Sequence, residues 1–338
     1  MSEMTAVDLP LPGPHAPTTS VPARRPGSVR RTSTIDMQRP DALMGTVRVD
    51  ARARDLLTGP DGEIADVAEQ RLEADVTLER TIAALRAAPA EPALDALVGI
   101  SSAGGFRRAA LRAAPEHAAA STLLNLLLDD LPAAGHVGGF SIGHAAQVPG
   151  PMHDLMVQHG PQSGTPDLCA GWAEGGGIMT FLRREGLPPV LTGPPAPVLA
   201  GADDDPDAWH ARPTLTTHAV RRARMLDVWT EGDVVHAHSL FRDSHVDGDG
   251  RETVIHEYTL DATLDLDGTI TGCDAQVRVL PWQECPQAIG SARRVIGTSA
   301  RDLRDRVRHT FTGTSTCTHL NDQLRSLEDV PALAARLT

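Results

Sequence analysis

The sequence predicts an α+β protein made of two tandem copies of one small strand-rich unit with C-terminal helices, packed as a pseudo-dimer. Two observations support this prediction. Short segments in which apolar and polar residues alternate, which is typical of strands, precede longer segments with helical periodicity. Several short motifs of the first half then recur in the same order in the second half. A repeated order of motifs indicates a duplicated unit.

The composition limits the classes of protein to which the chain can belong. Its 338 residues suffice for one large domain or two ordinary ones. The formal charge of −13 argues against nucleic acid or an anionic membrane as a partner, because both need clustered basic residues. Four cysteines are too few for a disulfide scaffold, and no apolar run is long enough to span a membrane. Because a secretory signal pattern is also lacking, we expect a cytoplasmic protein.

The first half begins with residues 1–28, which are rich in proline and which we expect to form a disordered leader. The first copy should cover 29–134. Alternation over 47–51 and 72–78 predicts strands there. Apolar spacing predicts helices over 94–111 and 121–131, the second ending before a proline.

The segment 135–220 between the copies is rich in glycine and proline, which by composition favours disorder. It also carries large apolar residues, among them Trp172 and Phe181. Such anchors are more typical of a binding loop or lid than of a spacer. An ordered lid and a flexible insertion therefore remain equally compatible with the sequence.

The second copy, 221–338, repeats the plan of the first. The segment that begins Arg30-Arg31 and continues to Asp36 is echoed by Arg221-Arg222 and Asp227. The further matches are Arg54-Asp55 with Arg242-Asp243, Thr81-Ile82 with Thr269-Ile270, Val98-Gly99 with Ile296-Gly297, and Leu124, Leu128 and Leu131 with Leu320, Leu324 and Leu327.

The copies differ in their chemistry at the start of the last helix. Cys317 and His319 stand in the second copy where Ser121 and Leu123 stand in the first. We therefore interpret the first copy as a degenerate, structural half. In the second copy Thr316 or Thr318 could cap the helix, and unpaired backbone N–H groups in its first turn would favour a thiolate.

Cys317 and His319 lie two positions apart, so on a regular helix their side chains would diverge by about 200°. They can converge only if Cys317 lies at or before the N-cap and His319 lies in the first turn. The alternative is a buried thiol with a histidine that satisfies a neighbour, because free cysteine is commonly a core residue.

Other residues of the second copy could complete a reactive site. Asp243, His256 and His319 could hold zinc or iron with one open coordination position. Cys285 could be a second ligand, a redox partner of Cys317 or a core residue. His236 and His238 share one face of a predicted strand and are equally well explained as half-exposed polar positions. Cys169 and Cys273 we interpret as structural, and the common motifs for nucleotide binding, zincins and α/β-hydrolases are lacking.

The second copy resembles the domain of unknown function 2889 family, which is found in bacteria. The resemblance lies in Leu240-Phe241-Arg242-Asp243, Ile255-His256-Glu257-Tyr258, Thr269-Ile270, Pro281, Cys285, Ile296-Gly297 and Cys317-Thr318-His319-Leu320-Asn321. It implies that Asp243, His256, Cys285, Cys317 and His319 belong to the family pattern, and it implies no particular activity. More distantly, the plan looks like that of iron–sulfur scaffold proteins, which is a likeness of fold alone.

We therefore expect an enzyme that cleaves a small organic substrate by a hydrolase or lyase reaction, at a Cys/His or metal site on the second copy. Cys317 would be the nucleophile or a ligand, and His319 a base or a ligand. Asp243 and His256 would orient the substrate or complete a metal site. The alternatives are a non-enzymatic metal or iron–sulfur binding protein and a ligand-binding module.

Overall fold

The protein is built on one eight-stranded antiparallel sheet with the strand order β10-β9-β8-β7-β2-β3-β4-β5. A computed structural model describes residues 11–159, 165–202 and 205–337. The main strands are β2 (Ser28–Gln38), β3 (Val47–Thr58), β4 (Ile64–Val76), β5 (Ile82–Ala88), β7 (Val220–Glu231), β8 (Val234–Val246), β9 (Glu252–Leu264) and β10 (Ile270–Val279). Two short strands, β1 (Ser20–Val21) and β6 (Ala200–Gly201), pair in parallel with each other.

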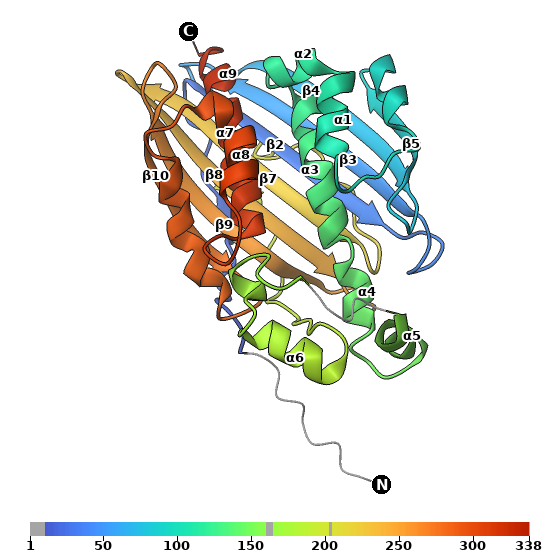
Figure 1. Ribbon diagram of the computed structural model, residues 1–338. Coiled ribbons are helices and arrows are strands. Elements are labelled where there is room, and N and C mark those ends of the chain that lie inside the picture. The colour runs from blue at the N-terminus through green and yellow to red at the C-terminus, as the bar shows by residue number, and fades with distance from the viewer. Residues whose placement is uncertain (1–10, 160–164, 203–204, 338) are drawn as a thin grey trace.

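Helices cover one face of this sheet, with α3 and α8 side by side near its middle (Figure 1). The α-helices are α1 (Phe106–Ala113), α2 (Pro115–Ala119), α3 (Leu123–Val137), α4 (Phe140–Ala145), α5 (Pro151–His159), α6 (Gly177–Glu185), α7 (Leu303–Thr310), α8 (Thr318–Ser326) and α9 (Val330–Ala334). The 3₁₀ helices are η1 (Pro92–Leu97), η2 (Ala170–Trp172), η4 (Cys285–Val295), η5 (Ala300–Asp302) and η6 (Leu327–Asp329). The predicted α+β class is confirmed. Among the described residues no helix has the length and hydropathy that crossing a membrane would require.

The two halves of the sheet share their strand order and a set of backbone hydrogen bonds. In the first half the N–H of Gly99 donates to Ile82, and in the second half the N–H of Gly297 donates to Ile270. Both glycines have a positive φ, 84° and 79°, a conformation that side chains disfavour. The conserved plan agrees with the motif matches in the sequence, and a tandem duplication as its origin stays a prediction.

The halves meet where β2 pairs with β7. Two buried ion pairs cross this seam on the face away from the helices. Arg30 binds Asp227, and Arg221 binds Asp36, each through two nitrogens of its guanidinium. The repeated motif of the sequence thus places an arginine opposite an aspartate at both ends of the seam. Bidentate pairs of this kind fix geometry as well as charge.

The face away from the helices is covered by the two segments that flank the first half in the sequence. Val21 packs with Leu199 and Trp209 against residues of β7 and β8. The main chain of residues 13 and 16 donates hydrogen bonds to the chain end of β10 and the turn after it. Residues 11–28 therefore differ from the predicted disordered leader, because their few apolar side chains dock on the sheet; residues 1–10 lie outside the described residues.

The first predicted helix is shorter than its apolar spacing indicates. Instead of one helix over 94–111, η1 ends at Leu97 and α1 begins at Phe106. The glycines Gly99 and Gly105 lie between them with positive φ, which a continuous helix cannot contain. The predicted stop before Pro132 is also wrong, since α3 continues through Pro132 to Val137. Because of this extension, the C-terminal end of α3 reaches the end of the sheet where α4 begins (Figure 1).

The segment between the halves forms α4, α5, η2 and α6, which gather at the end of the sheet beyond α3 and α8 (Figure 1). Ile178, Met179, Phe181 and Leu182 of α6 are buried. A backbone hydrogen bond from Ala170 to Thr316 ties this segment to the residue before the N-cap of α8. Its described residues are therefore packed at the candidate site, in the place that a lid would take.

Candidate functional site

Asp243 and His256 lie opposite each other on β8 and β9. They are register partners, and the ladder is irregular immediately after Asp243. Alternation along the strands turns both side chains toward the helices. Asp243 is fully buried and accepts two hydrogen bonds from the guanidinium of Arg222, at 2.9 and 3.1 Å. His256 Nδ1 lies 3.2 Å from the same carboxylate, in hydrogen-bonding distance.

His319 reaches this pair from the first turn of α8. Cys317 is the N-cap, with φ −125° and ψ 128°, and its side chain makes no capping hydrogen bond. The predicted threonine caps are therefore wrong. This extended N-cap makes convergence possible, and Cys317 Sγ lies 3.8 Å from Nδ1 of His319. The condition set by the helical geometry is met, because Cys317 precedes the helix and His319 lies inside it.

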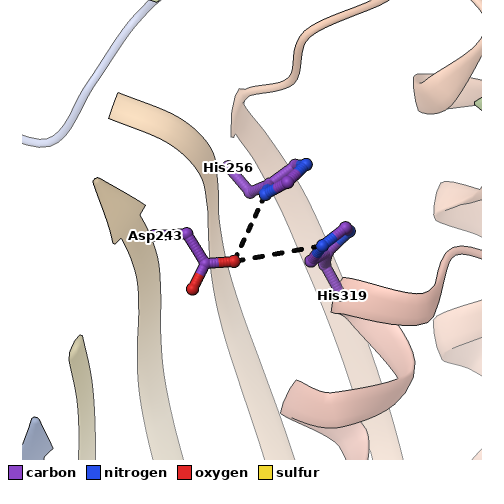
Figure 2. Close-up of side chains that lie close together, drawn as sticks. All are labelled: Asp243, His256 and His319. Carbon is purple, nitrogen blue, oxygen red and sulfur yellow. Dashed lines mark hydrogen bonds and ion pairs between the residues drawn. The ribbon is translucent and has the colours of Figure 1, made fainter. Parts of the chain in front are cut away.

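The imidazoles of His256 and His319 both approach one carboxylate oxygen of Asp243 (Figure 2). The Nε2 atom of His319 is 4.0 Å from Oδ2 of Asp243, and the two imidazole rings stack with centroids 3.5 Å apart. The side chains of His256 and His319 keep 12% and 16% of their exposure, whereas Asp243 has none. The arrangement leaves both imidazoles accessible to a small molecule while their anionic partner is sealed in.

Burial and charge set the protonation states of these groups. Burial alone would raise the pKa of Asp243, but Arg222 and the hydrogen bond with His256 more than offset it and hold the pKa well below its usual range. Burial, reinforced by His256, lowers the pKa of His319 well below its usual value. Asp243 is therefore an anion at neutral pH, and His319 is a neutral imidazole.

Burial opposes the thiolate that the position of Cys317 at the start of α8 predicts. It raises the pKa of Cys317 to about 11, although backbone N–H groups of the first turn act in the other direction. The hydroxyl of Tyr258 donates a hydrogen bond to Cys317 Sγ at 3.2 Å. Cys317 is thus a neutral thiol between Tyr258 and His319, and the expectation that the helix terminus favours a thiolate is wrong because burial outweighs the dipole.

Of these groups, His256, Cys317 and His319 line a largely apolar cavity of about 460 Å³ and make up its polar end. Ile255 and His256 of β9 lie on one side of it, and α4, η2 and the chain at 188–191 contribute to its other walls. Trp172, Ile178 and Trp282 are among its apolar lining residues. The volume is within the range of sites that enclose small organic molecules.

Cys285 lies in the wall of the same cavity, at the start of η4. Its Sγ would lie only 2.8 Å from a Cβ added at Gly171, so η2 passes directly over the thiol. Burial raises its pKa strongly, with further contributions from Cys317 and Cys169. Cys169 lines the cavity as well, so it does not lie remote from the site as a purely structural residue would. All four cysteines are free.

His136 belongs to the site but was missed in the sequence. It lies in the last turn of α3, lines the cavity, and has its pKa lowered by burial and by nearby Arg80. His319 lines the same cavity. The signal in the sequence was slight, because the residue follows Gly135 at the edge of the Gly/Pro-rich segment.

The other histidines of β8 do not reach the site. His236 stacks on Trp229 at 5.2 Å, and His238 pairs with Asp261 at 2.7 Å. Both occupy half-buried positions, in keeping with the simpler interpretation of the strand pattern. His245, two residues after Asp243, is buried against Phe140 and His144 and does not line the cavity.

The three converging residues have the donor types that a divalent cation needs. Asp243, His256 and His319 each offer one ligand atom, and these atoms lie within 4.8 Å of one another. An ionised carboxylate and a neutral imidazole are the forms that bind metal. Arg222 already engages both oxygens of Asp243, so a cation would share this carboxylate with a guanidinium. The donor atoms therefore suit a cation, whereas the positive charge of Arg222 opposes the binding of one.

The fold and this geometry define an α+β protein with an imidazole- and thiol-bearing cavity in its second half. Residues 220–333 match the model of the family described as Protein of unknown function (DUF2889). The predicted resemblance is confirmed for this second half, which contains Asp243, His256, Cys285, Cys317 and His319. No curated protein and no solved structure is significantly similar to the chain.

Proposed function

We propose that this protein is an enzyme that cleaves a small organic substrate by hydrolysis or elimination, with Asp243, His256 and His319 at its active site. The observation that carries the proposal is the position of a buried Asp–His hydrogen bond at the polar end of an apolar cavity. A histidine oriented by a carboxylate is the usual arrangement of a general base.

In this proposal His256 takes the proton. With its Nδ1–H donated to Asp243, its Nε2 is free to accept a proton from a substrate or a water molecule. Asp243 stays ionised and stabilises the imidazolium that forms, as it is held by Arg222. His319 remains neutral and presents one N–H to the reacting group.

Cys317 and Tyr258 act on His319 in this scheme. A neutral thiol that receives a hydrogen bond from Tyr258 can donate a hydrogen bond to Nδ1 of His319, which leaves the imidazole N–H on Nε2. Because the pKa of Cys317 is about 11, a nucleophilic thiolate is disfavoured at neutral pH. We therefore assign Cys317 a positioning role and Cys285 a place in the cavity wall.

A metal-dependent form of the same reaction is the second candidate, favoured by the convergence of Asp243, His256 and His319. Zinc or iron would supply a Lewis acid or an activated water there. His319 would then carry its proton on Nδ1, toward the sulfur of Cys317. Elemental analysis of purified protein, with activity measured before and after dialysis against EDTA, separates this form from the metal-free one.

The non-enzymatic readings have weaker support. An iron–sulfur site at Cys285 and Cys317 would leave the oriented Asp243–His256 pair without a role. A ligand-binding module would need the cavity but would not need an oriented histidine. An absorption spectrum with a chromophore that depends on Cys285 and Cys317 would favour the iron–sulfur alternative.

The matched pair His256→Gln and His238→Gln tests the enzyme proposal. Each histidine pairs with an aspartate on β8 or β9, but His238 lies outside the cavity. Both variants and the wild type would be incubated with arylalkyl esters, thioesters, 1,3-diketones and β-hydroxy acids, and products followed by mass spectrometry. We expect conversion with His238→Gln and a loss of about 10²–10⁴-fold with His256→Gln. Equal conversion by the two variants would contradict the proposal.

A further inference from the structure

We infer that the substrate is an organic acid with an apolar body, whose carboxylate is held by Arg80 of the first half while the body fills the cavity of the second half. This inference rests on the proposed function and names the substrate class of the same site. It also changes the role of the first half, which would supply part of the binding site instead of only supporting the fold.

The first support is the adjacency of two spaces around His319. The apolar cavity and a groove of about 420 Å³ between α3 and α8 share three lining residues, His136, Val137 and His319. The groove is more polar than the cavity, and Arg80 and Arg308 are among its lining residues. A molecule with one apolar and one charged end could therefore meet both at the proposed reactive imidazoles.

The second support comes from the charges that line the groove. Three of its arginines bind aspartates: Arg107 and Arg325 bind Asp129, and Arg222 binds Asp243. Within the described residues neither Arg80 nor the exposed Arg308 has a carboxylate partner, and the guanidinium of Arg80 makes one hydrogen bond, to the carbonyl of Pro132 at 3.3 Å. In a protein with a net charge of −13, a half-buried guanidinium without an anion is a local surplus of positive charge. A carboxylate is the ligand that such a group binds best.

The third support is the backbone of Arg80. It occupies the turn between β4 and β5 with φ 65°, a left-handed conformation that arginine disfavours. The turn between β9 and β10 has the same hydrogen bonds but has Gly268 at this position, with φ 87°. The fold thus accepts glycine here, and the first half keeps an arginine despite the strain. Strain of this kind often marks a functional position.

The position of the guanidinium agrees with this role. Its Nη2 lies beside the last turn of α3, where a Cβ added at Gly135 would be 3.7 Å away. The next residue is His136, which lines both the cavity and the groove. A carboxylate bound by Arg80 would therefore lie next to the shared wall, with its apolar chain directed past His136 and His319.

A pair of probes of the same shape tests the charge. We would titrate the full-length protein with 5-phenylvalerate and with its neutral amide, 5-phenylvaleramide, and follow the fluorescence of Trp172 and Trp282 in the cavity wall. The wild type should bind the acid at least about tenfold more tightly than the amide at low salt. Arg80→Gln should abolish this preference and leave the affinity for the amide within about twofold. Arg80→Lys should retain part of it.

Arg308→Gln is the matched control, because Arg308 is an exposed arginine of the same groove. The preference for the acid should survive in this variant. A preference that persists in Arg80→Gln, equal binding of the two probes, or no binding of either at millimolar concentration would overturn the inference. Binding is measured here without turnover, so a protein that binds the acid through Arg80 but shows no His256-dependent chemistry would refute only the proposed function.

Discussion

The two halves of the sheet show which residues the fold requires and which ones the second half adds. Arg31 and Asp55 form a buried bidentate pair in the first half, as Arg222 and Asp243 do in the second. Opposite Asp55 on the next strand is Ala68, whereas opposite Asp243 is His256. Asp243 is therefore held in place by an arrangement common to both halves.

The same contrast holds at the starts of the two central helices. Leu123 begins α3 and is buried in the first core, whereas the residue matched to it, His319, faces Asp243. A leucine satisfies the packing at this position, so the imidazole is not needed for it. The second half thus differs from the first by two histidines on a similar scaffold, together with the thiol that contacts one of them.

The largest effect is expected when the second half is given the residues of the first. In His319→Leu we expect turnover to fall by about 10²–10⁴-fold, because one of the two reactive imidazoles is lost. The melting temperature should stay the same or rise, since leucine fits the matched site of the first half and, unlike histidine, buries no polar group. Activity with a converted substrate and calorimetry check both. Retention of activity would show that the difference between the halves is not catalytic.

The buried arginines should be important for folding in both halves. Arg222→Met leaves Asp243 without a guanidinium and should lower the free energy of unfolding by about 3–5 kcal/mol. Arg31→Met leaves Asp55 with the partly exposed Arg336 and should cost somewhat less. Urea unfolding of the two variants measures it. A much smaller loss for Arg222→Met would mean that Asp243 has other cationic support, and the analogy between the two pairs would fail.

Much of the fold could be predicted because it rests on local patterns. Alternation gives the strands, and the order of the repeated motifs pointed to two similar halves that end in a helix. The missed parts depend on tertiary contacts. The raised pKa of Cys317 arises from burial under the segment that carries η2, and no local pattern shows how that segment packs. The contributions of His136 and Arg80 require knowing that the end of α3 reaches the second half's cavity.

Acid should destabilise the second half through His319. Because the folded-state pKa of His319 is lowered, its stabilising contribution is complete above its unfolded pKa, about 6.5, and is lost as the pH falls below it. Between pH 6.5 and 5 the wild type should therefore lose up to about 1.4 kcal/mol more per pH unit than His319→Leu. Urea midpoints at several pH values measure the difference. Parallel curves would show that the pKa of His319 is not lowered in the folded protein.

Cys317→Ser introduces the residue that the first half has at this place and should have a modest effect. A hydroxyl can accept the hydrogen bond from Tyr258 and donate to His319, so we expect a loss of about 1 kcal/mol in stability and less than about tenfold in turnover. Kinetics and thermal melting provide the test. A loss of turnover beyond about a thousandfold would restore the nucleophilic role that the sequence suggested for this cysteine.

The smallest effect is expected at the turn between β4 and β5, where the first half has Arg80 and the second half has a glycine. Arg80→Gly gives the turn between β4 and β5 the residue of its counterpart, Gly268. Relief of the left-handed strain should raise the free energy of unfolding, and loss of the hydrogen bond to Pro132 should lower it, so the net change should stay within about 1 kcal/mol. Arg80→Ala keeps the strain and loses the guanidinium, so it should be less stable than Arg80→Gly. If instead both variants are destabilised equally by several kcal/mol, Arg80 serves mainly to hold the end of α3, and the comparison of the two turns identifies a structural residue.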